Sequence, residues 1–150
     1  MINPQKEDVY YDSYGKPHFK NSKNFLSISH SNEMVAVSID QKATTGIDIQ
    51  WITDKIIRIK EKFLNPKEQQ ITSNDPLELT YYWSIKEALF KIYGKKDAFL
   101  KENFELIAFE VTYSFASEDQ WSYRQLSTLK IKGEKGLFEH TDQAVMKRVL

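Results

Sequence analysis

The segment between Asp75 and Gly94 most constrains the fold, because it carries the signals for both ends of one long helix. Asp75 is a favoured N-cap residue, Pro76 suits the first helical position, and Gly94 suits the end. Apolar residues recur between them at three- and four-residue intervals: Tyr81, Ile85, Ala88, Leu89 and Ile92. This spacing predicts a helix with one face buried in a core.

A different face of this helix combines a carboxylate with an ammonium. Trp83, Glu87 and Lys91 follow one another at four-residue steps and therefore stack along the helix. A carboxylate and an ammonium held side by side on a rigid helix suit a metal-bound phosphate site. Ordinary solvated helices carry the same pair, which stabilises them by about 0.2–0.5 kcal/mol. The helix alone leaves both interpretations open.

Composition narrows the class of protein. The chain has 150 residues, 41% of them hydrophobic, which suits one globular domain spanning residues 1–150. Lys+Arg and Asp+Glu number 21 each, so the net charge favours neither a nucleic acid nor a membrane surface as partner. The chain has no cysteine, which agrees with a reducing compartment. The sequence has no secretion signal and no run of about 20 apolar residues that could span a membrane, so we expect a cytoplasmic protein.

Alternating apolar and polar residues predict strands before and after the helical region. The expected strands cover residues 24–31, 34–39, 44–50, 104–113, 121–126, 128–131 and 144–149. A turn at 31–33 makes the first two an antiparallel hairpin. Short strands around a few helices favour an α+β class, with a mostly antiparallel sheet packed against one long helix and one or two short ones.

Shorter elements precede the long helix. Apolar residues within 56–63 predict an amphipathic helix after Thr53, a suitable N-cap. Asn65-Pro66 ends it, and residues 67–70 predict another helical turn. Near the start of the chain, Gly15-Lys16-Pro17 predicts a fixed loop that leaves the lysine amine free.

Few side chains remain as candidates for chemistry. Asp48 lies within an expected strand, where an acid is disfavoured unless it faces solvent or a site. Together with Glu87 and Gln50 it offers the hard oxygen ligands that Mg²⁺ prefers. The cations that suit phosphate groups are Lys16, His30, Lys86 and Lys91. Both residues also have simpler explanations: Asp48 could lie on an exposed strand face, and His30 could be an ordinary surface histidine.

Other catalytic patterns are missing from the sequence. It contains no Gly-rich phosphate loop, no H-E-x-x-H and no EF-hand pattern. Ser29 and Ser31 flank His30, but neighbours in a strand point to opposite faces, and no G-x-S-x-G turn accompanies them. The residues therefore indicate phosphoryl chemistry without indicating a substrate.

Four segments carry a resemblance to a known family. They are Gly15-Lys16-Pro17, residues 24–31 (Asn-Phe-Leu-Ser-Ile-Ser-His-Ser), Gly46-Ile47-Asp48-Ile49, and residues 83–88 (Trp-Ser-Ile-Lys-Glu-Ala). In this order and spacing they resemble the 4′-phosphopantetheinyl transferase superfamily, in particular the surfactin-synthetase-activating branch with two similar halves per chain. The resemblance implies a holo-[acyl-carrier-protein] synthase type of activity. Such an enzyme transfers phosphopantetheine from coenzyme A to a serine of an acyl or peptidyl carrier protein, with Mg²⁺, and releases 3′,5′-adenosine bisphosphate.

The resemblance also implies a metal site and a base. Asp48 and Glu87 would bind Mg²⁺ and act in catalysis together with Lys91. Gln50 stands at the third acidic position of the family's Gly-Ile-Asp-Ile-Glu pattern. Its amide oxygen can still ligate a metal, but we expect weaker Mg²⁺ binding than at a three-acid site, or a water in that place. Glu87, or a water on the metal, would accept the proton of the attacking serine.

The residues that the resemblance implies for coenzyme A binding are Lys16, Ser29, His30, Lys86 and Lys91. The first three would bind its 3′-phosphoadenosine part and Lys91 its phosphates, while Lys86 belongs to the motif without a defined role.

The length of the chain departs from the two-half enzymes, which are much longer. Only residues 16–39 correspond to the end of their first half. Single-half relatives are shorter and assemble as trimers with sites between subunits. Because the family's site lies between halves, we expect the chain to form a homo-oligomer or to bind coenzyme A with one side exposed.

Two functions from different classes therefore stay open. The first is a working transferase, which is favoured by the presence of all four motif residues Asp48, Glu87, Lys86 and Lys91. The second is a shortened relative that binds coenzyme A or a carrier protein without efficient turnover, which Gln50 and the missing half favour. A small interaction domain with chance motif matches is a third reading.

Overall fold

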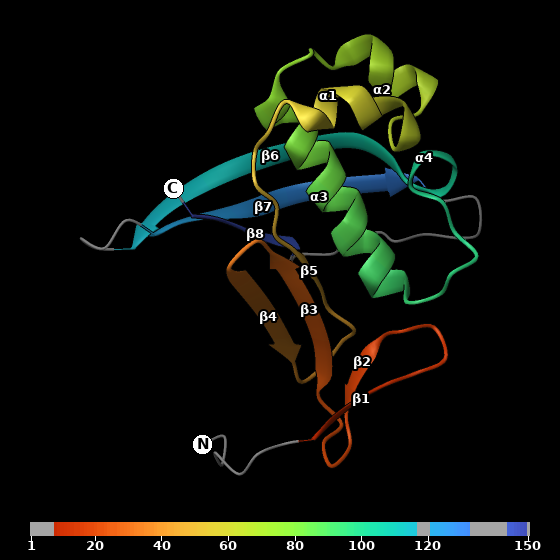
Figure 1. The fold of residues 1–150 in the computed structure, drawn as a ribbon, viewed down its shortest axis with the longest axis vertical. Helices are drawn as coiled ribbons and strands as arrows, with labels where there is room; N and C mark the ends of the chain where they lie inside the picture. The colour runs from red at the N-terminus through yellow and green to blue at the C-terminus, as the bar shows by residue number, and fades with distance from the viewer. Residues whose placement is uncertain (1–7, 117–120, 133–143, 150) are drawn as a thin grey trace.

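The computed structural model describes residues 8–116, 121–132 and 144–149, and side chains within residues 8–106. In chain order the elements are β1 (Val9–Tyr11), β2 (Pro17–Phe19), β3 (Phe25–Ser31), β4 (Met34–Asp40), β5 (Gly46–Asp48), α1 (Lys55–Ile59), the 3₁₀ turn η1 (Lys60–Lys62), α2 (Pro66–Ile71), α3 (Pro76–Tyr93), α4 (Leu100–Asn103), β6 (Glu105–Ala116), β7 (Trp121–Lys132) and β8 (Ala144–Val149). Helices and largely antiparallel strands confirm the predicted α+β class (Figure 1).

The described strands form two sheets. One has the order β1-β2-β3-β4 and is antiparallel throughout, while the other has the order β5-β8-β7-β6. In the second sheet, β5 pairs in parallel with β8 and the remaining pairs are antiparallel. Figure 1 shows α3 running beside β5, with α1 and α2 at one end of the molecule and β1 and β2 at the other. The long helix therefore lies where the two sheets meet.

Helix α3 begins and ends where the sequence predicts. The Asp75 carboxylate accepts hydrogen bonds from the backbone N–H groups of Leu77 and Glu78, and Pro76 occupies the first turn. Gly94 ends the helix with a φ of 71°, in the left-handed region that glycine adopts most readily. The predicted apolar face is buried: Ala88 is 3% exposed, and the other four residues of the face belong to the main core, which also contains Phe63, Leu64, Phe104 and Leu106.

The hairpin of β3 and β4 is also confirmed, with Ser31 opposite Met34 across its turn. Asn32 supplies the left-handed residue of this turn, with a φ of 51°. Other boundaries differ from the predictions. The strand expected at 44–50 is shortened to β5, and the two strands expected at 121–126 and 128–131 form the single strand β7.

The short helices also differ from their predictions in detail. The helix expected at 56–63 is divided into α1 and η1, and its N-cap residue is Asp54 rather than Thr53. Helix α2 starts at the predicted break, because the Asn65 side chain caps it. Helix α4 was not expected, since four residues are too few to show a helical period. Among the described residues, no helix combines the length and the apolar content that crossing a lipid bilayer requires.

A buried ion pair joins the middle of α3 to its neighbours. The Lys86 ammonium donates hydrogen bonds to Glu68 Oε2 (2.6 Å), to the Phe63 carbonyl (2.7 Å) and to the Leu100 carbonyl (3.2 Å). The other oxygen of Glu68 accepts from the backbone N–H of Leu106 at 2.9 Å. Burial lowers the pKa of Lys86, and the contact with Glu68 opposes that shift. The pair therefore ties α2, α4 and β6 to α3 with its polar atoms satisfied.

We predict that Glu68→Ala will destabilise the fold by roughly 3–5 kcal/mol, because it leaves the Lys86 ammonium buried without its counter-ion. Urea unfolding measures this loss. Glu33→Ala, at an exposed turn position, is the control and should change little. The double variant Glu68→Leu with Lys86→Met should recover most of the loss, since it removes both charges. A Glu68→Ala protein as stable as the wild type would contradict this account.

Candidate active site

Strand β5 lies against α3 without a side chain between them. A Cβ atom on Gly46 would overlap the carbonyl oxygen of Ala88 and lie 2.7 Å from Cγ1 of Ile92. Only glycine therefore allows the strand to come this close to the helix. Side chains alternate along a strand, so Asp48, two residues later, points to the same side as Gly46. This brings Asp48 to the helix face that carries Lys91.

The carboxylate of Asp48 is buried, with 3% of the residue exposed. Its Oδ1 accepts hydrogen bonds from Ser29 Oγ (3.0 Å) and from Lys91 Nζ (2.9 Å). The Lys91 ammonium also donates to the Ile47 carbonyl at 2.9 Å. Oδ2 of Asp48 is buried and has no hydrogen-bond partner within the described part of the chain. A buried carboxylate oxygen without a partner is costly, so Oδ2 is a candidate position for contact with a ligand.

Two serines of β3 hold β5 in place. Ser27 Oγ accepts the backbone N–H of Ile47 at 3.1 Å, and Ser29 Oγ accepts that of Ile49 at 3.3 Å. Since Ser29 also donates to Asp48, its hydroxyl fixes both the strand and the carboxylate. The predicted contact of Ser29 with coenzyme A stays a prediction, and the contacts of its hydroxyl in this structure orient Asp48.

Glu87 is half-buried and lies close enough to Asp48 and Lys91 for their charges to act on it. Burial raises the pKa of its carboxyl, the negative charge of Asp48 raises it further, and the Lys91 ammonium opposes the shift. The three side chains therefore act on one another electrostatically, as a common site requires. Gln50, also half-buried, follows β5 two residues after Asp48.

These residues fit a metal that takes only part of its coordination from the protein. Within the described residues, no three His, Cys, Asp or Glu side chains form a group that could hold an ion. The two carboxylates Asp48 and Glu87, with one buried oxygen unpartnered, match the one or two carboxylates with which Mg²⁺ is commonly held beside phosphate oxygens and water.

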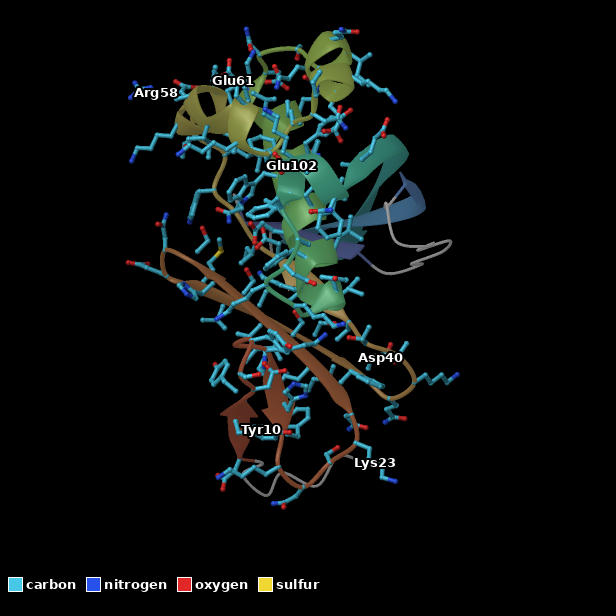
Figure 2. All side chains as sticks on the ribbon, turned by 90° about the vertical axis from the view of Figure 1, so that its right-hand side faces the viewer. Tyr10, Lys23, Asp40, Arg58, Glu61 and Glu102 are labelled. Carbon is cyan, nitrogen blue, oxygen red and sulfur yellow. The ribbon has the colours of Figure 1, made fainter. Side chains whose placement is uncertain are left out.

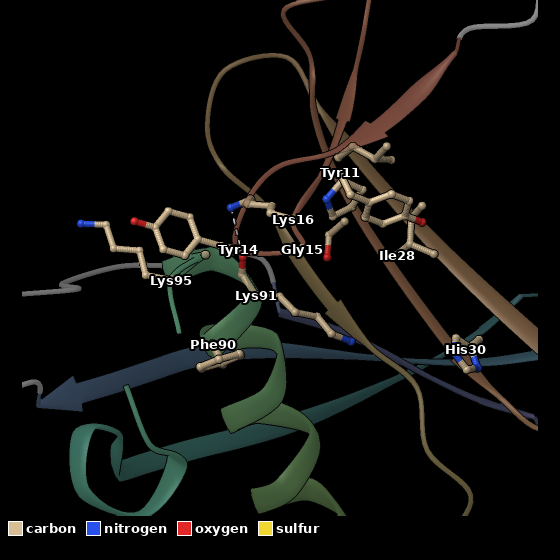
Figure 3. A pocket seen from close by; sticks show the side chains of 13 residues that line it. Tyr11, Tyr14, Gly15, Lys16, Ile28, His30, Phe90, Lys91 and Lys95 are labelled. Atoms are coloured by element: carbon tan, nitrogen blue, oxygen red, sulfur yellow. Dashed lines mark hydrogen bonds between the residues drawn. The ribbon is translucent and has the colours of Figure 1, made fainter. Parts of the chain in front are cut away.

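A hollow of about 300 Å³ opens beside Lys91, and we call it the basic hollow. Its lining residues are Tyr11, Tyr14, Gly15, Lys16, Pro17, Leu26, Ser27, Ile28, His30, Phe90, Lys91, Gly94 and Lys95. Figure 3 shows Lys95 and His30 toward opposite sides of the view, with Lys91 between them. Its volume lies at the lower end of the range of small-molecule sites. The predicted residues Lys16, His30 and Lys91 therefore share one concave surface.

The amine of Lys16 is not free, contrary to the prediction from its loop. It donates to Thr44 Oγ1 (2.7 Å) and to the carbonyls of Lys91 (3.0 Å) and Ile92 (3.2 Å). Those carbonyls belong to the last turn of α3, where no further helical N–H reaches them. A lysine at this position also complements the helix dipole. Lys16 therefore closes the end of α3 while it lines the basic hollow.

Lys86 is not brought to this site. It is 0% exposed and its ammonium is enclosed by Glu68 and two backbone carbonyls. Its contacts in the structure are those of the core, so they give no support to a role in coenzyme A binding. Sequence reasoning also missed Phe90 and Lys95, which line the basic hollow without belonging to a motif segment.

We predict that Gly46→Ala will destabilise the protein by about 1–3 kcal/mol, because the added methyl overlaps the Ala88 carbonyl. Thermal or urea unfolding measures the effect. Lys42→Ala, at an exposed position before β5, is the control and should unfold as the wild type does. Unchanged stability of Gly46→Ala would show that the strand and the helix separate at little cost.

Two comparisons with known proteins found a similarity that bears on the family of the chain. A family model described as "4'-phosphopantetheinyl transferase superfamily" matches residues 44–135, more than half of the chain. The chain is also 34% identical over 87 residues to the protein named 4'-phosphopantetheinyl transferase psf-1 of Bacillus pumilus. That similarity covers 54% of this chain and 37% of the relative, so the chain matches little more than a third of the relative's length.

Proposed function

The chain belongs to the 4′-phosphopantetheinyl transferase superfamily, and we propose from this premise that it transfers 4′-phosphopantetheine from coenzyme A to a serine of an acyl or peptidyl carrier protein. This is activity of the holo-[acyl-carrier-protein] synthase type. The observation that carries the proposal is the buried Asp48 carboxylate, which contacts Lys91, acts electrostatically on Glu87 and keeps one oxygen unpartnered among the described residues.

The basic hollow supports coenzyme A as the donor. Lys16, Lys91 and Lys95 line it together with His30, and lysine ammonium groups bind phosphates. The rings of Tyr11 and Tyr14 add apolar faces, as small-molecule sites commonly do. In this proposal, Lys16 and His30 bind the 3′-phosphoadenosine part and Lys91 binds the phosphates.

Asp48 and Glu87 are the residues that would hold Mg²⁺, with the Gln50 amide oxygen or a water beside them. A bound Mg²⁺ would neutralise charge on the diphosphate as the leaving group departs. Lys91 adds a fixed positive charge next to Asp48. Burial and the charge of Asp48 raise the pKa of the Glu87 carboxyl in the chain without a bound metal, and its position beside Asp48 and Lys91 places it at the proposed site. We assign Glu87 as the base for the partner's serine.

The reaction balances with these groups. The serine oxygen bonds to the phosphorus that carries the pantetheine arm, and its proton passes to Glu87. The bond from that phosphorus to the bridging oxygen breaks, so 3′,5′-adenosine bisphosphate leaves with the bond's electron pair.

A second candidate is a relative that binds coenzyme A or a carrier protein without efficient turnover. Gln50 favours it, because a neutral amide attracts the metal less than a carboxylate does. The first proposal also includes a cytoplasmic location and a single domain over residues 1–150. It includes neither a nucleic acid nor a membrane as partner, and the equal numbers of acidic and basic residues support this last point.

We predict that Glu87→Gln will lower the transfer rate by about 100-fold or more, because an amide cannot accept the serine proton. The measurement is the Mg²⁺-dependent gain in mass of an apo carrier protein by one phosphopantetheine arm. Glu78→Gln, on the same helix, is the matched control and should keep the wild-type rate. Normal transfer by Glu87→Gln would remove the base assignment, and a wild-type chain that binds coenzyme A without transfer would favour the second candidate.

We also expect the homo-oligomer that the sequence suggested. On β4, Val35 (69% exposed), Val37 (51%) and Ile39 (49%) form an aliphatic face that the described residues leave open. A second copy would cover such a face. Light scattering should then give a native mass above the 17.6 kDa of one chain, and Val37→Lys should lower it. A wild-type monomer that binds coenzyme A tightly would contradict this expectation.

A further inference from the structure

The loop that joins β1 to β2 closes around the carboxylate of Asp12. The backbone N–H groups of Tyr14 and Lys16 both donate to Oδ1 of Asp12 at 2.9 Å. The backbone N–H of Asp12 donates to the Lys16 carbonyl at 3.0 Å, and the Asp12 carbonyl accepts the N–H of Gly15 at 2.9 Å. Asp12 therefore binds both the N–H and the carbonyl of Lys16, which fixes the backbone from which the Lys16 side chain starts.

A second set of contacts holds Asp12 itself. Its Oδ2 lies 2.9 Å from Nε2 of His18. The His18 ring stacks on that of Tyr10, with centroids 5.3 Å apart, and the two residues are partners in the pairing of β1 with β2. The hydrogen bond with His18 and that from the Lys16 N–H lower the pKa of the Asp12 carboxyl, so it is an ionised acceptor near neutral pH. Both of its oxygens are used within the hairpin.

The Lys16 side chain extends from this loop to a distant part of the chain. It passes close to Gly94, where a Cβ atom would lie 2.9 Å from Lys16 Cδ. Its ammonium reaches Thr44 and the last turn of α3, and the residue lines the basic hollow. A lysine ammonium is carried on a flexible four-carbon stem. Its average position in the hollow therefore depends on how firmly the backbone of the loop is held.

We propose that Asp12 is a positioning residue for coenzyme A, because it fixes the loop that presents the Lys16 ammonium to the basic hollow. The inference rests on the proposed function, since it takes coenzyme A as the ligand of that hollow. Asp12 is not among the residues that line the hollow, so it acts through Lys16. It also lies outside the four motif segments, so the family resemblance gives it no role.

The hairpin that contains Asp12 lies apart from the main core. Figure 2 shows Tyr10 at the opposite end of the molecule from Arg58 and Glu61. Among the described residues, the main core includes none from β1, from β2 or from the loop between them. A substitution at Asp12 should therefore alter the loop and leave the core folded.

The test titrates the chain with coenzyme A by calorimetry in the presence of Mg²⁺. We expect Asp12→Ala to weaken binding about five- to tenfold, because two loop N–H groups lose their acceptor. Asp12→Asn should bind within about twofold of the wild type, since its amide oxygen can accept the same two N–H groups. In the transfer assay, Asp12→Ala should raise the KM for coenzyme A and leave kcat unchanged. A general loss of structure would lower kcat as well.

A double-mutant cycle tests whether Asp12 acts through Lys16. Lys16→Met removes the ammonium, and in this background Asp12→Ala should weaken binding no further, because no ammonium is left to position. Asp8→Ala is the matched control, since it removes the same charge from the start of the same hairpin. The Asp8 carboxylate contacts only the exposed Lys20 ammonium, at 3.5 Å, among the described residues. This control should bind coenzyme A as the wild type does.

Three outcomes of the titration would overturn the assignment while the proposed function stands. They are unchanged binding by Asp12→Ala, an equal loss in Asp12→Asn or Asp8→Ala, and an equal loss in the Lys16→Met background. A fall in kcat at constant KM, or an Asp12→Ala chain that circular dichroism shows to be unfolded, would overturn it as well. If the wild-type chain does not bind coenzyme A, the proposed function fails first and the inference fails with it.

Discussion

The contact between Gly46 and the Ala88 carbonyl is the constraint on which the site depends. It brings the backbone of β5 onto α3 and so places Asp48 within hydrogen-bond distance of Lys91. Ser27 and Ser29 of β3 then hold β5 in place, because their hydroxyl oxygens accept the backbone N–H groups of Ile47 and Ile49. The acid centre therefore arises from backbone packing between a strand and a helix, and the side chains follow from it.

Helix α3 and the β3–β4 hairpin were predictable because their signals are local. Asp75 and Gly94 act on the residues next to them, and Asn32 supplies the turn in a pattern that alternates on both sides. The extent of β5 was not predictable, because it pairs in parallel with β8, almost a hundred residues later. The alternation of apolar and polar residues within one strand does not indicate which distant strand it will pair with.

The residues of the site divide in the same way. The approach of Asp48 to the helix-borne Lys91 follows from motifs that the sequence displays. The positions of the other two lysines do not, because their partners are distant in the chain. Lys86 is neutralised by Glu68 in the core, and Lys16 meets carbonyls 75 and 76 residues away. The residues next to a lysine in the sequence do not indicate whether its ammonium will bind a buried acid or the end of a helix.

The coordination of Lys16 has a consequence for ligand binding. An ammonium has three hydrogens, and the three acceptors around this one already use them all: Thr44 Oγ1 and the carbonyls of Lys91 and Ile92. An incoming phosphate must displace one of these acceptors before it gains a full bond. Occupancy of the basic hollow and fraying of the last turn of α3 are consequently linked equilibria, in which each reports on the other.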